Sequence, residues 1–99
     1  MLKVLVVEDE ELIRKGIVLA VDWASLNCVV VGEAANGQEG LEQAAQCQPN
    51  LIVTDLKMPK MDGLEMIEEL RNRGCEAYVL ILTAYDSFAY AQQALRVGA

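Results

Sequence analysis

The sequence predicts an α/β fold built on a doubly wound parallel sheet, and three observations lead to this prediction. Short apolar runs rich in β-branched residues alternate with segments of helical periodicity, as expected of strands joined by crossover helices. Each run is continuously apolar, which is typical of strands that are covered on both faces. The chain has 99 residues, 54% of them apolar, and this is enough for one domain with one core.

Four strands are expected, at residues 4–7, 29–31, 51–53 and 79–82. A first helix should follow the first strand, because apolar residues recur there at helical spacing. These residues form one apolar stripe: Leu12, Ile13, Gly16, Ile17, Ala20 and Val21. A similar series after the last strand indicates a fourth helix: Phe88, Ala91, Ala94 and Leu95.

The two middle helices have clear start signals. Asn36 stands three residues before Glu39, and Asp62 three residues before Glu65, which is the spacing of a capping box. Gly74 is expected to end the third helix, since glycine is favoured just after a helix C-terminus. Three residues of this helix are expected to face inward: Leu64, Ile67 and Leu70.

The composition excludes several classes of function. Fifteen acidic and eight basic residues give a net charge of −7, so this segment is not expected to bind nucleic acid. The absence of histidine excludes histidine zinc sites, serine–histidine triads, histidine general bases and phosphohistidine carriers. No apolar run approaches about 18 residues, and the N-terminal run is too short for a signal peptide. We therefore expect a soluble, cytoplasmic chain without membrane contact.

The three cysteines, Cys28, Cys47 and Cys75, are widely spaced and form no Cys-x-x-Cys motif. The simplest interpretation is that they are reduced and pack as small apolar side chains of a cytosolic protein. A redox-sensing role is the alternative.

Polar side chains follow three of the four expected strands. Glu8 and Asp9 follow the first strand, Asp55 follows the third, and Thr83 follows the fourth. Ligands of doubly wound sheets bind at the carboxyl ends of the strands, so these side chains are expected to share one pocket. Each also has a structural alternative, because Asp9 could cap the first helix, Asp55 could form a turn and Thr83 could hold a loop.

Taken together, these residues indicate a metal-assisted phosphoryl site. Neighbouring carboxylates repel each other, and protonation or a cation relieves the repulsion. Oxygen ligands without histidine or cysteine favour a hard ion, above all Mg²⁺, which also offsets the charge of a phosphoryl oxygen. Asp55 would then attack phosphorus to give an acyl phosphate, and the Thr83 hydroxyl would bind a phosphoryl oxygen.

Three stretches resemble the receiver domain of two-component response regulators: residues 4–10 (VLVVEDE), 51–64 (LIVTDLKMPKMDGL) and 80–85 (LILTAY). Their order, spacing and residue types match over essentially the whole chain. The resemblance implies a flavodoxin-like sheet of five strands in the order 2-1-3-4-5. It also implies that a sensor histidine kinase phosphorylates Asp55, which switches an output domain. Such a domain is no enzyme beyond its own phosphotransfer and dephosphorylation.

The resemblance also assigns roles around Asp55. It implies that Asp9 and Asp55 bind Mg²⁺ directly, that Glu8 acts through water, and that the Lys57 backbone carbonyl is a further ligand. The side chains of Lys57 and Tyr85 occupy positions that modulate hydrolysis of the phosphoryl group in the family. Solvated side chains without such a role are the alternative.

Residues 21–23 (VDW), 34–41 (AANGQEGL) and 83–91 (TAYDSFAYA) look like receivers attached to AraC-type helix-turn-helix domains, so a DNA-binding output domain is expected. The family's receiver continues to a fifth strand, a Lys-Pro pair and a fifth helix. This implies that residues 1–99 are one receiver domain, truncated at its C-terminus, with the sheet order 2-1-3-4. Without that Lys we expect slow phosphorylation. The bare edge at residues 79–82 is expected to favour self-association.

Three other functions are alternatives. A binding module of the same fold that is not phosphorylated would have no physical need for the acidic cluster. A haloacid-dehalogenase-like phosphatase would carry a second aspartate where Lys57 stands. A flavin carrier needs a phosphate loop rich in Ser, Thr and Gly, whereas residues 8–11 (EDEE) would repel a phosphate in the absence of a metal.

Overall fold

The computed structural model describes residues 1–82 of the chain. They form a four-stranded parallel sheet of β1 (Leu2–Val7), β2 (Cys28–Ala34), β3 (Leu51–Thr54) and β4 (Tyr78–Ile81). The strands lie in the order β2-β1-β3-β4, which confirms the predicted sheet. Each strand lies within a few residues of its expected position, and β2 is longer than expected at both ends. Thr83, Tyr85 and the expected fourth helix lie outside the described residues.

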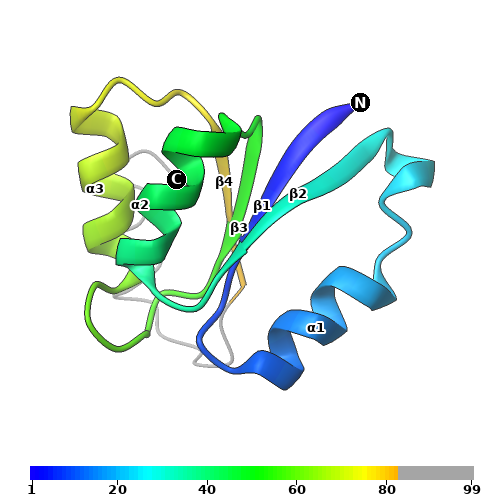
Figure 1. The fold of residues 1–99 in the computed structure, drawn as a ribbon, viewed down its shortest axis with the longest axis horizontal. Helices are drawn as coiled ribbons and strands as arrows, with labels where there is room; N and C mark the ends of the chain where they lie inside the picture. The colour runs from blue at the N-terminus through cyan, green and yellow to red at the C-terminus, as the bar shows by residue number, and fades with distance from the viewer. Residues whose placement is uncertain (83–99) are drawn as a thin grey trace.

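Helices cover both faces of the sheet (Figure 1). Helix α1 (Glu11–Ala20) lies on one face, and α2 (Gly37–Cys47) and α3 (Gly63–Asn72) lie on the other. A short 3-10 helix, η1 (Ala24–Leu26), leads into β2. Within residues 1–82, no helix combines the length and apolar character needed to cross a membrane.

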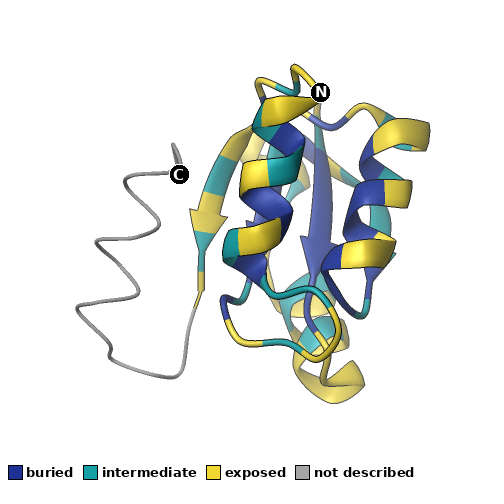
Figure 2. Cartoon of the chain, turned by 90° about the vertical axis from the view of Figure 1, so that its left-hand side faces the viewer, coloured by how far each residue is buried: buried dark blue, intermediate teal, exposed yellow. Residues whose placement is uncertain are grey.

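The core is divided by the sheet into two clusters. Successive side chains of β1 point to opposite faces. Leu5 and Val7 therefore join α2 and α3, while Val4 and Val6 lie beneath α1. All four side chains are at most 1% exposed, so β1 is buried on both faces, as its continuous apolar run predicts. Figure 2 shows the same distribution, with burial concentrated in the central strands and on the inner sides of the helices, and with β4 partly exposed.

The helix starts are as predicted. At the start of α2 one half of the predicted capping box forms, because the Asn36 side chain accepts a hydrogen bond from the Glu39 amide at 2.9 Å, while the Glu39 carboxylate accepts from the Ala35 amide. At the start of α3, Asp62 and Glu65 form a reciprocal capping box. The third helix also ends as predicted, because Gly74, with φ of +83°, follows its last turn in a conformation that glycine adopts readily.

Of the two predictions about helix faces, that for α1 is wrong and that for α3 holds for two of its three residues. The stripe of α1 does not form a buried face, since Leu12 is 88% exposed, Ile13 is 45% exposed, and no α1 residue is fully buried. Only Ile17 of that stripe, with its neighbour Val18, packs against the core beneath α1. In α3, Ile67 and Leu70 are buried as predicted, whereas Leu64 is only half-buried. The position that sequence reasoning missed is Met66, which is fully buried among the core residues.

The cysteines are free thiols. Cys28 is buried in the core beneath α1, and Cys75 packs against the core on the other face. For these two residues this agrees with the prediction that the cysteines act as small apolar side chains, whereas Cys47 is half-buried and its Sγ donates to the Val31 carbonyl.

Strand β2 contains an irregularity that sequence reasoning did not predict. Val4 pairs with Val30, but the next residue, Leu5, pairs with Gly32, so that Val31 is bulged out of the register. A bulge of one residue exchanges the faces of all side chains that follow it. Glu33 is consequently paired with Val6, on the face of the sheet that α1 covers.

Candidate functional site

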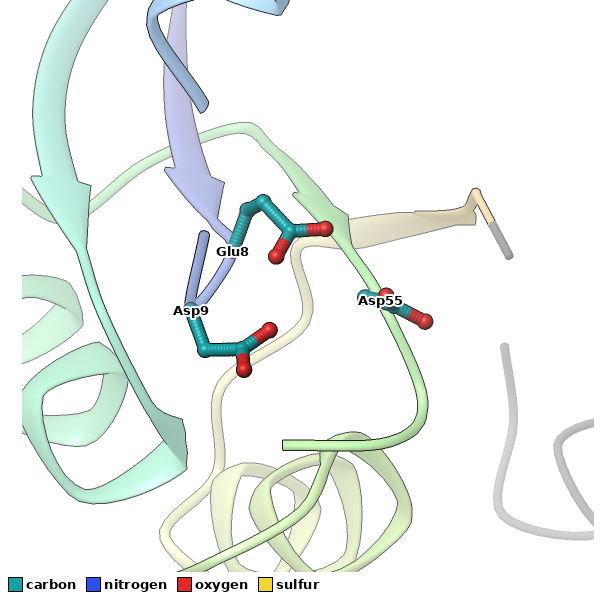
Figure 3. Close-up of side chains that lie close together, drawn as sticks. All are labelled: Glu8, Asp9 and Asp55. Atoms are coloured by element: carbon teal, nitrogen blue, oxygen red, sulfur yellow. The ribbon is translucent and has the colours of Figure 1, made fainter. Parts of the chain in front are cut away.

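Three carboxylates meet at the carboxyl end of the sheet (Figure 3). Glu8 and Asp9 follow β1, and Asp55 follows β3. One carboxylate oxygen from each of the three lies within 4.8 Å of the others. The structure therefore brings together the three acidic residues that the sequence placed at strand ends.

The pairing of β1 with β3 sets this geometry. Val7 and Thr54, the last residues of the two strands, are partners in the parallel ladder. The Asp55 amide continues the ladder by donating to the Val7 carbonyl at 3.2 Å. The strands thus end at the same level, and their next side chains, Glu8 and Asp55, are brought side by side.

Glu8 is the most unusual of the three acids, because its side chain is only 5% exposed. Burial disfavours the charged form and raises its pKa from 4.5 to about 7. A hydrogen bond from the Glu10 amide to Oε2, at 2.8 Å, opposes this rise. Hydrogen bonding with Asp9 and the negative charge of Asp55 add to it. A cation placed among these groups would relieve the same electrostatic conflict.

Asp9 is exposed and borders a hollow of about 380 Å³. The remaining lining residues come from the loop between β3 and α3: Lys57, Met58, Pro59 and Asp62. Asp9 does not cap α1, because the N-cap position belongs to Glu10, which makes no side-chain cap bond. The structural alternative for Asp9 is therefore not supported.

Asp55 is half-buried and partly fixed by its own backbone. Its Oδ1 accepts a hydrogen bond from the Leu56 amide at 2.7 Å, and its carbonyl accepts one from the Thr54 hydroxyl at 2.8 Å. The first of these bonds is local, since its donor is the next residue in the chain, so Asp55 has a structural role as well as a place in the cluster.

The loop after Asp55 is closely packed against its surroundings. The Gly63 amide donates to the Leu56 carbonyl at 2.8 Å, and a Cβ at Gly63 would collide with the Asp55 carbonyl oxygen. The Gly37 amide at the start of α2 donates to the Met61 carbonyl, also at 2.8 Å. The two glycines allow backbone to approach backbone, and this holds the loop beside the acidic cluster.

The donor set fits a hard divalent cation. It consists of carboxylate oxygens, and the chain has no histidine that would favour a softer metal. The hollow beside Asp9 leaves room for the water molecules that Mg²⁺ retains when it binds to proteins. Lys57 also lines this hollow, which is compatible with its predicted role as a carbonyl ligand.

Sequence reasoning missed two residues near the cluster. Arg14, in α1, donates from Nη1 to the Glu8 carbonyl at 2.8 Å, and it forms an ion pair with Glu33 of β2 at 3.2 Å. The only available signal was the pair of adjacent cations, Arg14 and Lys15, between the apolar residues of α1.

Comparisons with known proteins agree with this geometry. The family described as "Response regulator receiver domain" matches residues 4–99. Among curated proteins, the chain is 36% identical over 98 residues to the transcriptional regulatory protein YesN of Bacillus subtilis. It is 31% identical over 96 residues to the transcriptional regulatory protein HptR of Staphylococcus aureus. The matches cover 99% and 97% of this chain but only 27% and 37% of those relatives.

Solved structures show the same likeness in three dimensions. The REC domain of AraT, a response regulator from Geobacillus stearothermophilus, has a TM-score of 0.90 and 40% identity. The signal receiver domain of the response regulator NarL from Mycobacterium tuberculosis also scores 0.90, with 36% identity. Both matches cover 99% of this chain, and they cover 76% and 78% of the two solved chains.

Proposed function

Because this chain belongs to the family of response regulator receiver domains, we propose that it is a phosphoacceptor signalling domain in which Asp55 is the site of phosphorylation. The observation that carries the proposal is the cluster of Glu8, Asp9 and Asp55 at the carboxyl end of the sheet. Its acids stand at the positions where the sequence resembles the receiver motif. A fold of this kind without the chemistry would have no use for a buried glutamate of raised pKa.

In the proposed reaction an Asp55 carboxylate oxygen forms a bond to phosphorus. The bond from phosphorus to the donor atom breaks at the same time, and its electron pair leaves with the donor. Because Oδ1 accepts the Leu56 amide, Oδ2 is the attacking oxygen. Asp9, Asp55 and the Lys57 carbonyl would hold Mg²⁺, with Glu8 acting through water. The bound ion would neutralise charge on the phosphoryl oxygens.

The wider roles belong to the same proposal. The phosphodonor would be a sensor histidine kinase in the cytoplasm, and the output would be a DNA-binding domain, in keeping with the regulators named above. Residues 1–99 would form one receiver domain. Thr83 would donate its hydroxyl to the phosphoryl group, and Lys57 and Tyr85 would modulate its hydrolysis.

The test is phosphorylation by a small acyl-phosphate donor with Mg²⁺, followed by intact-mass measurement. We expect a single phosphoryl adduct that disappears in Asp55→Asn and without Mg²⁺. Asp22→Asn is the matched control, because Asp22 is an exposed aspartate beyond the end of α1 and outside the cluster. A folded chain that forms no adduct would contradict the proposal for residues 1–99. The same assay on a chain extended beyond residue 99 would then separate a phosphoacceptor that needs further residues from the binding module that is not phosphorylated.

Self-association is a second part of the proposal, and it rests on β4. Within residues 1–82 this strand pairs only with β3, and its Leu80 is 50% exposed. A second copy of the chain could pair with the other edge of β4. Sedimentation velocity over a range of concentrations should then show a dimer that Leu80→Lys weakens. A strictly monomeric profile at high concentration would contradict it.

A further inference from the structure

We propose that Arg14 is a positioning residue for the acidic site, anchored by Glu33 and acting through the backbone of Glu8. The inference rests on the proposed function, since it concerns the metal site formed by Glu8, Asp9 and Asp55. It assigns a role to two residues that lie outside the receiver motif and contribute no atom to the cluster.

The contacts of Arg14 link three elements. Its guanidinium donates from Nη1 to the Glu8 carbonyl at 2.8 Å and from Nε to Oε1 of Glu33 at 3.2 Å. The Arg14 side chain is only 14% exposed, and the Glu33 side chain is 28% exposed, so both bonds are partly shielded from water. A planar guanidinium fixes the directions of its donors, which makes Arg14 a rigid connection between β2 and the end of β1.

The Glu8 backbone is held on both sides by this arrangement. Its amide donates to the Ala34 carbonyl at 2.9 Å, which extends the ladder with β2. Its carbonyl, at the point where the chain leaves the sheet, is bonded by Arg14. The peptide group that Arg14 contacts joins Glu8 to Asp9, so its orientation determines where both carboxylates point.

The bulge in β2 is what makes the connection possible. In an unbroken register Val7, and not Val6, would be the partner of Glu33. Glu33 would then lie on the face that α2 and α3 cover, together with Val7. With Val31 bulged out, Glu33 lies on the face covered by α1. Its carboxylate there reaches both Arg14 and Lys15.

Lys15 provides a matched control within the same ion pair. Its ammonium contacts Glu33 at 3.0 Å, and this bond is the main reason that the pKa of Glu33 is lowered. Its side chain is 49% exposed, and among the described contacts it makes none with the Glu8 backbone. Lys15→Met and Arg14→Met therefore remove the same charge from the same partner, but only the second removes the bond to Glu8.

The electrostatic and positioning effects have opposite signs. Removing a cation near three carboxylates raises the local negative potential, so charge alone would leave Mg²⁺ binding unchanged or slightly stronger in both variants. Losing the orientation of Glu8 and Asp9 would weaken it. Interactions that orient metal ligands from outside typically contribute about 10- to 100-fold in affinity. We therefore expect the Mg²⁺ Kd to rise about tenfold in Arg14→Met and to change less than about twofold in Lys15→Met.

The experiment is a Mg²⁺ titration of the ¹⁵N-labelled chain, followed by the amide resonances of residues 8–10 and 55–57. Without metal, hydrogen exchange of the Glu10 amide gives a second readout, and it should accelerate in Arg14→Met alone. If Arg14→Met does not fold, Arg14→Lys replaces it. This variant keeps the positive charge but lacks the planar guanidinium that donates to Glu8 and to Glu33 in fixed directions, so its Mg²⁺ binding should also weaken.

The outcomes separate the two proposals. Wild-type chain that binds no Mg²⁺ would overturn the metal site itself. Wild-type chain that binds Mg²⁺, with equal affinities in Arg14→Met and Lys15→Met, would overturn the positioning role and leave the site intact. A loss confined to Arg14→Met, in a variant with a native spectrum, supports the inference.

Discussion

Replacing Glu8 by glutamine is expected to stabilise the metal-free domain at alkaline pH while removing part of its metal site. Glu8 is nearly inaccessible to solvent, and two other acids surround its carboxylate. Its pKa in the folded chain is therefore about 7, compared with 4.5 for an unperturbed glutamate. Glutamine has almost the same shape and carries no charge at any pH, so the substitution isolates the effect of ionisation.

The magnitude follows from the linkage between protonation and folding. A carboxyl whose pKa is raised by folding binds its proton more tightly in the folded state. The contribution of Glu8 to the free energy of unfolding is thus fully present below pH 4.5 and is lost as the pH rises to 7. Each unit of difference between the folded and unfolded pKa corresponds to about 1.36 kcal/mol, so the ionisation of Glu8 lowers the free energy of unfolding by on the order of 3 kcal/mol above pH 7. That is a large part of the roughly 5–15 kcal/mol that stabilises a typical domain.

The assay is urea denaturation of wild type and Glu8→Gln in the presence of a chelator at pH 5, 6, 7 and 8. The difference between the two free energies of unfolding should grow by up to about 3 kcal/mol over this range, in favour of the variant. Saturating Mg²⁺ at pH 8 should stabilise wild type more than the variant, because the ion compensates the charge of Glu8. A difference that does not change with pH would refute the reasoning, since Glu8 would then ionise equally easily in both states.

Three further outcomes are expected. The affinity for Mg²⁺, measured by titration, should rise between pH 5 and 7 as Glu8 loses its proton, and should level off above pH 7. Gly63→Ala should destabilise the chain by about 1–3 kcal/mol, because the added Cβ would meet the Asp55 carbonyl oxygen. Gly16→Ala should instead stabilise the chain by up to about 1 kcal/mol, because Gly16 lies in a helix and has open space around its Cα. Asp62→Ala should lower the free energy of unfolding by about 1 kcal/mol through loss of the α3 cap, as measured by urea denaturation.

The strands could be predicted because each is marked by a continuous apolar run, whereas their order was implied by the resemblance to receiver domains. Residues 4–7 are apolar without interruption, and all four are buried on one face or the other. Parallel pairing then places every strand end at one edge, which is why Glu8, Asp9 and Asp55 could be grouped before their distances were known. The raised pKa of Glu8 could not be predicted in this way, because it depends on how completely the end of β1 is covered.

The apolar stripe of α1 shows where periodicity is insufficient. Spacing identifies the helix, but it does not say how much of an apolar face another element covers. Ile17 and Val18 are the apolar residues of α1 that pack onto the sheet, whereas Leu12 and Leu19 are more than 80% exposed. In α3 the missed residue Met66 is one position from the predicted Ile67, because the buried side of that helix is centred between them.

The bulge at Val31 was the least predictable feature, and the geometry of the site depends on it. Val29, Val30 and Val31 are identical side chains, so the sequence contains no information about which of them leaves the register. The register is decided further along the strand. Gly32 pairs with Leu5 on the α2 face, where an added Cβ would lie 2.8 Å from Gln43 Oε1 and 3.3 Å from Leu5 and Cys47. A larger residue there would require these side chains to shift, so glycine is favoured on the α2 face. The next residue, Glu33, then turns toward α1, where Arg14 connects it to the backbone of Glu8.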